Sequence, residues 1–185
     1  MNIGLILVDI QNDYFPGGRM ELVGIDNAAA NAKALLEYFR QKKLPVFFIQ
    51  HISVGEKASF FLPDTDGVKI HESINPLAEE TVIQKHYPNS FRETRLLDEL
   101  QKAEIQQVVI CGAMSHMCID ATTRTAADFG FGCTVVENAC ASRDLQFGGE
   151  TIPAAKVHGA FMAALGAAYA KVTNSDEFIS RLEKE

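Results

Sequence analysis

The sequence has few basic residues and no run of them. Lysine and arginine together number 17 against 24 aspartates and glutamates, which gives a formal net charge of −7. A protein that binds nucleic acid needs a basic surface to neutralise the phosphate backbone. This sequence therefore argues against nucleic acid as a partner.

Long hydrophobic runs are also missing. The longest apolar stretch, residues 159–170, is too short and too rich in alanine to span a bilayer. No basic segment precedes the apolar residues near Met1 in the manner of a secretory signal peptide. We therefore expect a cytoplasmic protein that does not bind membranes.

No Cys-x-x-Cys pair occurs among the four cysteines, which are Cys111, Cys118, Cys133 and Cys140. The chain is large enough to fold without disulfide bonds, so we expect reduced thiols. By default, each of them is a small, buried hydrophobic side chain.

The overall composition is that of an ordinary globular protein. Apolar residues make up 47% of the 185 residues and charged residues 22%, and no internal repeat, linker or low-complexity segment interrupts them. The length suits one hydrophobic core. We predict a single domain over residues 1–185.

Short β-branched runs alternate with longer amphipathic ones, a pattern typical of α/β proteins. The run at residues 3–8 is wholly apolar, as in a parallel strand buried on both faces. The predicted strands cover residues 3–8, 46–50, 81–85, 107–111, 133–137 and 170–173. The predicted helices cover residues 26–44, 90–100, 115–129, 151–169 and 176–182. Right-handed crossovers between them give a three-layer α/β/α, Rossmann-like fold with a mostly parallel six-stranded sheet.

Local signals mark several ends of these elements. Asp26 suits an N-cap, and Ser90 with Glu93 has the form of a capping box. Gly130 suits the position after the third helix, because glycine tolerates positive φ. Residues 52–80 form an irregular segment longer than ordinary connections, and we expect this segment to cover a site.

Reactive side chains follow three of the predicted strands, at the edge where open parallel sheets bind ligands. Asp9 follows the first strand, Lys85 ends the third, and Cys118 comes shortly after the fourth. With Ser115 as an N-cap, Cys118 lies in the first turn of a helix, where unpaired N–H groups favour a thiolate. Asp9 could instead cap a turn or pair with a lysine for structural reasons alone, and the sequence by itself does not bring the three residues together.

Several motifs occur in a characteristic order. Residues 9–15 read Asp-Ile-Gln-Asn-Asp-Tyr-Phe, and Lys85 precedes Asn-Ser-Phe at 89–91. Residues 112–118 read Gly-Ala-Met-Ser-His-Met-Cys, followed by Thr-x-Arg-x-Ala at 122–126. Together these motifs resemble the isochorismatase-like cysteine hydrolase superfamily, which includes nicotinamidases, N-carbamoylsarcosine amidases and isochorismatases. The resemblance covers essentially the whole chain and implies the isochorismatase-like hydrolase fold.

The resemblance implies that Cys118, Asp9 and Lys85 form a catalytic triad. Asp9 would take the thiol proton, Lys85 would stabilise the thiolate, and Cys118 would attack a carbonyl carbon to form a thioester. The resemblance also implies an oxyanion hole made by the backbone N–H groups of Met114 and Cys118, with a cis peptide bond between Ala113 and Met114.

One part of the family's pattern is absent. The nicotinamidase branch holds zinc or a similar ion through an Asp-x-His motif and a further histidine after the second strand, whereas residues 50–57 contain only His51. Three protein ligands are not available in so short a segment. We therefore expect no metal and no other cofactor.

The substrate pocket is expected to be lined from the same loops. Phe15, Phe60 and Phe91 lie near a triad residue in the sequence or on the long irregular segment, and His51 stands at the end of the second strand. Aromatic walls suit a small, flat or partly apolar molecule, although such residues also fill cores. A small-molecule substrate is the expected partner, and the resemblance implies a homo-oligomer, a dimer or tetramer.

Three functions fit these residues. The first is cleavage of a C–N bond in a small amide or ureide. The second is hydrolysis of a vinyl ether with release of pyruvate, which needs an acid and water but no covalent nucleophile. The third is a catalytically idle binding or regulatory module. The combination of Cys118 with Asp9 and Lys85 favours the first, and the lack of Gly-x-Gly-x-x-Gly after the first strand argues against nucleotide binding.

Overall fold

A computed structural model describes residues 2–184, which fold around one parallel sheet of six strands. The sheet strands, from one edge to the other, are β3 (Thr81–Lys85), β2 (Val46–His51), β1 (Ile3–Val8), β4 (Gln107–Ala113), β5 (Gly132–Ala141) and β8 (Lys171–Thr173). Every neighbouring pair in this sheet is parallel, as the sequence predicts. The helices are α1 (Ile25–Gln41), α2 (Leu96–Lys102), α3 (Asp120–Asp128), α4 (Ala154–Ala168) and α5 (Ser175–Leu182).

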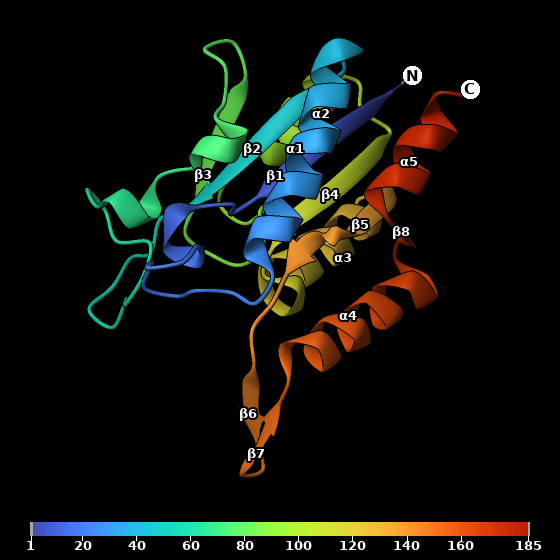
Figure 1. Ribbon diagram of the computed structural model, residues 1–185. Helices are drawn as coiled ribbons and strands as arrows, with labels where there is room; N and C mark the ends of the chain where they lie inside the picture. Colours follow the sequence, from blue (N-terminus) through green and yellow to red (C-terminus); the bar gives the residue numbers. More distant parts are fainter. Residues whose placement is uncertain (1, 185) are drawn as a thin grey trace.

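The connections place helices on both faces of the sheet, which confirms the three-layer arrangement (Figure 1). From β1 the chain moves in one direction through α1 to β2, whereas α2, α3 and α4 lead in the opposite direction. Right-handed crossovers therefore put α1 on one face and the other three on the opposite face. α5 joins α1, and the rings of Phe39 and Phe178 lie 6.4 Å apart between them.

The strand order reverses between β1 and β4, which lie side by side in the middle of the sheet. At such a point the two connections leave the sheet toward opposite faces, and a crevice opens beyond the carboxyl ends of the strands. All six residues of β1 are buried, which explains their uninterrupted apolar character. Within residues 2–184 no helix is both long and apolar enough to cross a membrane.

The predicted helix caps at Asp26 and Ser90 are wrong. α1 begins after Gly24, whose φ of 75° makes the turn into the helix, and Asp26 lies inside the first turn instead of capping it. The capping box at Ser90 does not exist, because α2 starts only at Leu96. Glu93 has a φ of 56°, which no helical residue can have, and Ser90 is buried.

The end of β5 also differs from the prediction. The strand continues to Ala141, past the predicted end at residue 137, and its register against β4 shifts between Ile110 and Gly112. An antiparallel hairpin follows, made of β6 (Leu145–Phe147) and β7 (Glu150–Ile152), and the sequence analysis missed it. The predicted helix over residues 151–169 therefore starts later, at Ala154. In Figure 1 this hairpin projects away from the rest of the protein.

Gly112 allows β1 and β4 to approach each other at the centre of the sheet. Its φ is 121°, and a Cβ at this position would overlap the carbonyl oxygen of Val8 on β1. Gly130, which follows α3 as predicted, has a φ of 89° and has no atom within contact distance of an added Cβ among the described residues. The two glycines therefore share the unusual backbone conformation, but only Gly112 is enclosed.

Replacing each glycine by alanine should separate backbone strain from overpacking. Gly130→Ala should cost about 1–2 kcal/mol of unfolding free energy, because only the left-handed backbone is penalised. Gly112→Ala should cost roughly 1–3 kcal/mol more, because backbone atoms of β1 would have to move. Urea denaturation of both variants measures the difference. Equal losses would contradict the tight β1–β4 contact.

Candidate active site

Three reactive side chains come from different strands to one point at the carboxyl edge of the sheet. Asp9 follows β1 directly, and its φ of 52° turns the chain sharply away from the sheet. Lys85 is the last residue of β3. Cys118 lies in a π-helical turn, Ser115–Ile119, which connects β4 to α3.

The distances bring these side chains into direct contact. Lys85 Nζ lies 2.8 Å from Asp9 Oδ2 and 3.2 Å from Cys118 Sγ. All three residues are buried, with Asp9 and Lys85 at 0% and 1% exposure. The predicted convergence of the three residues is therefore present in the structure. A buried carboxylate and a buried ammonium stabilise each other's charge, whereas either one alone would be costly.

The carboxylate of Asp9 interacts with both other side chains of the site. Its Oδ2 lies 2.8 Å from Lys85 Nζ, and the Cys118 thiol donates a hydrogen bond to the carboxylate. The thiol proton is therefore already directed toward Asp9. A carboxylate in this state can accept a proton, which is what a general base does.

The environment of Cys118 corrects one expectation. Cys118 lies near the start of the helical segment that begins at Ser115, as predicted, but this first turn is π-helical, and the predicted preference for the thiolate is not met. Burial, followed by the charge of Asp9, raises the pKa of the Cys118 thiol, and the ammonium of Lys85 lowers it by less. In the resting protein the proton therefore stays on sulfur.

The turn that carries the thiol is tied to neighbouring elements. The peptide bond between Ala113 and Met114 is cis, as the resemblance implies. The Met114 carbonyl accepts hydrogen bonds from the N–H groups of Met117 and Ile119. Ser115 does not cap a helix as predicted: its hydroxyl donates to the carbonyl of Ala141 and lies 2.8 Å from the imidazole of His158.

His51 also reaches the centre of this site. Its Nδ1 lies 3.0 Å from Lys85 Nζ and 3.9 Å from Asp9 Oδ2. Burial lowers the pKa of His51 to about 4; the charge of Lys85 also lowers it, and Asp9 opposes both effects. The imidazole is therefore neutral near pH 7.

The donor atoms of Asp9, His51 and Cys118 lie within 4.8 Å of one another, close enough in principle to hold a metal ion. However, Lys85 Nζ is 3.2 Å or less from each of these side chains and occupies the space between them. A metal ion would have to displace the buried ammonium or bind next to its positive charge, which would repel the ion. These residues therefore do not fit a resident metal ion.

The segment at residues 52–80 is attached to the site by the residues that follow Asp9. Gln11 donates to the carbonyls of His51 and Val68, and the carboxylate of Asp13 accepts a hydrogen bond from the N–H of Phe61 at 2.6 Å. Sequence reasoning missed both roles. Polar residues directly after a wholly apolar strand were the available signal for these roles. The hydrogen-bond partners of Gln11 and Asp13, however, lie about 40 to 57 residues away in the sequence.

Each of the predicted aromatic residues has a ring partner of its own. Phe15 stacks on the imidazole of His71 at 3.5 Å, and Phe60 packs within 5.9 Å of the ring of Tyr14. Phe91 contacts the half-exposed ring of Phe129. Of the four predicted pocket residues, His51 is the one that touches the reactive group directly.

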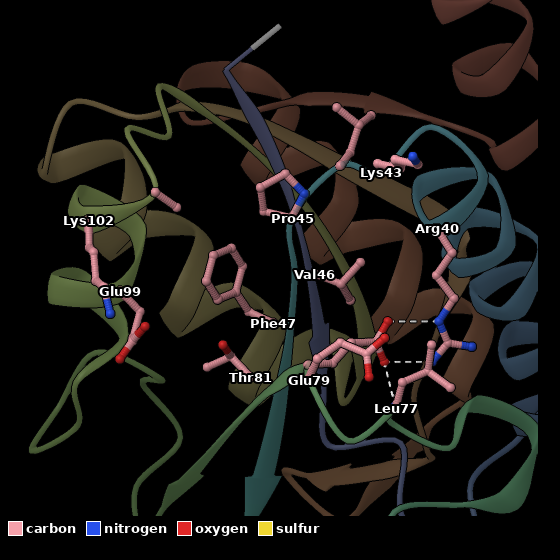
Figure 2. A pocket seen from close by; sticks show the side chains of 13 residues that line it. Arg40, Lys43, Pro45, Val46, Phe47, Leu77, Glu79, Thr81, Glu99 and Lys102 are labelled. Carbon is pink, nitrogen blue, oxygen red and sulfur yellow. Dashed lines mark hydrogen bonds and ion pairs between the residues drawn. The ribbon is translucent and has the colours of Figure 1, made fainter.

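A separate cavity of about 540 Å³ lies at the opposite, amino edge of β2 and β3 (Figure 2). Its wall includes Phe47, Thr81 and the ion pair between Arg40 and Glu80, whose closest atoms are 2.7 Å apart. The cavity has no contact with Asp9, Lys85 or Cys118. It is therefore not the place where the thiol would meet a substrate.

Comparison with known proteins agrees with this geometry. Residues 4–177 match the family model of the isochorismatase domain. The isochorismatase family protein YddQ of Bacillus subtilis is 52% identical over 97% of this chain and 99% of its own length. The crystal structure assigned to an isochorismatase hydrolase of Oleispira antarctica is 49% identical, with a TM-score of 0.93 over 97% of this chain and 96% of the other. A streptothricin hydrolase of Streptomyces noursei is 30% identical over 88% of this chain and 64% of its own length.

Two substitutions should change the reactivity of the Cys118 thiol in opposite directions. Lys85→Met removes the charge that lowers the thiol pKa and should slow alkylation by iodoacetamide, whereas Asp9→Asn removes a charge that raises the pKa and should accelerate it. Each pKa unit changes the thiolate fraction, and with it the rate near neutral pH, by about tenfold. Mass spectrometry of the Cys118 peptide over time measures the rate.

Cys133 provides the internal control in the same samples. Burial alone raises the pKa of this thiol to about 11, and neither charge contributes to it. Its alkylation rate should be equal in all three proteins. Slower alkylation of Cys118 in both variants would show that access, and not charge, governs this thiol.

Removal of metal ions should leave the protein unchanged. Because Lys85 occupies the space between the donor atoms, dialysis against a chelator should alter neither the melting temperature nor the rate of Cys118 alkylation. Elemental analysis of the undialysed protein is the companion measurement. Stoichiometric zinc together with a lower melting temperature after chelation would contradict our interpretation of the site.

Proposed function

The chain belongs to the isochorismatase family of hydrolases, and from this membership we propose that it cleaves a C–N bond in a small amide or ureide. Cys118 acts as the nucleophile, Asp9 as the general base and acid, and Lys85 as the stabilising charge. The contact of one ammonium with both the thiol and the carboxylate is the observation that carries the proposal.

The first half-reaction forms a covalent intermediate. Asp9 takes the proton from Cys118 as the sulfur attacks the carbonyl carbon of the substrate, and a tetrahedral oxyanion forms. Lys85 stabilises the thiolate as the proton leaves. The C–N bond then breaks, Asp9 gives its proton to the departing nitrogen, and the acyl group remains on sulfur as a thioester.

The second half-reaction releases the acid and restores the enzyme. Asp9, again a carboxylate, removes a proton from a water molecule that attacks the thioester carbonyl. The second tetrahedral intermediate collapses with Cys118 as the leaving group, and the thiolate takes the proton back. The hydrogen bond between the Cys118 thiol and the buried carboxylate of Asp9 supports this role, because the same carboxylate can accept the proton in both steps.

Oxyanion stabilisation is assigned to the backbone N–H groups of Met114 and Cys118. Cys118 lies in the turn that carries the thiol, and Met114 is the residue directly before that turn, which supports this assignment. Donors fixed in the backbone need little reorganisation as charge develops on the oxygen. Aromatic pocket walls made by Phe15, Phe60 and Phe91 would suit a small, partly apolar substrate.

The similarity to a streptothricin hydrolase supports hydrolysis of a nitrogen-containing small molecule. The family name also points to the second candidate, hydrolysis of a vinyl ether, and the buried carboxyl of Asp9 could serve there as an acid. The two reactions differ in their need for sulfur. C–N cleavage passes through the Cys118 thioester, whereas vinyl-ether hydrolysis needs only an acid and water.

A substrate panel with one substitution distinguishes these reactions. Purified protein is assayed on small amides, ureides and isochorismate for release of ammonia, amine or pyruvate. Cys118→Ala should lower kcat on the best C–N substrate by at least about a thousandfold, because the covalent path is removed. Cys133→Ala, which removes a thiol far from the site, should retain activity.

The outcome that overturns the proposal is equally specific. Pyruvate release from isochorismate that survives Cys118→Ala, with no turnover of any amide or ureide, would assign the vinyl-ether reaction. Circular dichroism of the variant shows that the loss of activity does not come from unfolding.

A further inference from the structure

We propose that His51 is a positioning residue that holds the ammonium of Lys85 between Asp9 and Cys118. The inference rests on the proposed function, because it assigns a supporting role within that same site. It gives His51 a task other than the substrate contact expected from the sequence.

The hydrogen-bonding capacity of Lys85 limits which neighbours can hold its ammonium. An ammonium carries three N–H donors and no acceptor. Besides Asp9 and Cys118, its neighbours are His51 Nδ1 at 3.0 Å and the carbonyl oxygens of Tyr87 at 3.0 Å and Pro88 at 3.4 Å. His51 is therefore the only side chain bonded to Lys85 Nζ, among the residues described, that takes no direct part in the proposed reaction.

The charge of the imidazole decides whether this contact attracts or repels. A protonated His51 would place a second positive charge 3.0 Å from the ammonium, and burial disfavours the charged form as well. The neutral ring offers one lone pair. If Nδ1 accepts from Lys85, the ring proton is on Nε2, so the contact with Lys85 also selects the tautomer.

The fold holds His51 in place from both sides. In the register of β2 and β3, His51 is the direct partner of Lys85. The Gln11 side chain bonds both backbone groups of His51: its oxygen accepts from the His51 N–H at 2.7 Å, and its nitrogen donates to the His51 carbonyl at 2.9 Å. The backbone of His51 is thus attached to the segment that follows β1 as well as to β3, and this holds the residue beside Asp9.

Without this acceptor, only the reactive groups and the carbonyl oxygens of Tyr87 and Pro88, which follow Lys85 in the chain, would set the position of the ammonium. Lys85 Nζ lies closer to Asp9 than to Cys118, at 2.8 Å against 3.2 Å. As the proton moves from the thiol to Asp9, the negative charge moves from carboxylate to sulfur, and the ammonium must serve both states. A neutral acceptor that takes no part in the proton transfer keeps the ammonium in place during this change.

Three variants test the inference on the best substrate from the panel. His51→Ala removes the acceptor, and His51→Asn retains an acceptor oxygen near the position of Nδ1. His86→Ala is the matched control, because His86 is an exposed histidine next to Lys85 whose ring contacts the carbonyl of Ile52.

We expect His51→Ala to lower kcat by about tenfold to a hundredfold, the range for losing one hydrogen bond to a charged group. KM should change by less than about threefold, because the substrate contacts remain. His51→Asn should recover most of kcat, and His86→Ala should keep the wild-type rate. A merely structural role would lower the melting temperature of both His51 variants without this recovery.

Three results would overturn the inference. A rise in KM at constant kcat would make His51 part of the pocket wall. A His51→Asn variant as slow as His51→Ala would show that a hydrogen-bond acceptor at the position of Nδ1 does not contribute to the rate. A His51→Ala variant with wild-type kcat would show that Lys85 needs no third side chain.

Alkylation of Cys118 keeps this test independent of the proposed function. The charge of Lys85 acts on the thiol without any substrate, so His51→Ala should slow iodoacetamide alkylation near neutral pH and His51→Asn should restore the rate. If the wild-type protein cleaves no C–N substrate, the proposed function fails. The alkylation series then still decides the role of His51: equal rates in all variants reject it.

Discussion

The buried contact between the Lys85 ammonium and the Asp9 carboxylate is the interaction on which the site depends. Two opposite charges out of water are tolerated when they lie 2.8 Å apart, and each would be expensive without the other. This pair fixes the carboxyl ends of β1 and β3 relative to each other. The thiol of Cys118 then needs only to reach the same ammonium from β4 to become part of a reactive group.

The close packing of β1 against β4 is a second constraint on the position of the site. The order of the sheet reverses between β1 and β4, and Gly112 allows the two strands to approach closely just before the chain enters the thiol-bearing turn. A larger residue there would press on the Val8 carbonyl, one residue before Asp9. The packing of the sheet and the distance between Asp9 and Cys118 are therefore not independent.

Much of the fold could be predicted because it depends on local patterns. The apolar run of β1 indicates a strand buried on both faces, and the carboxyl ends of parallel strands indicate where Asp9, Lys85 and Cys118 lie. The capping box at Ser90 failed because its geometry depends on Glu93, whose positive φ belongs to a tertiary turn. The contact of His51 with Lys85 depends on the pairing register of β2 and β3. One sequence does not show that register.

The proposed reaction needs a thiol that keeps its proton at rest and loses it during attack, and the net charge of the buried group is compatible with both states. With Asp9 ionised, Lys85 protonated and Cys118 neutral, the three side chains sum to zero. Transfer of the thiol proton to Asp9 leaves a protonated carboxyl, the same ammonium and a thiolate, which again sum to zero. The transfer therefore creates no net charge in a medium that solvates charge poorly. A neutral His51 preserves this balance, whereas a protonated His51 would add a positive charge in both states. The same constraint, the cost of net charge in a buried group, therefore accounts for the low pKa of His51 and for proton transfer from sulfur to Asp9.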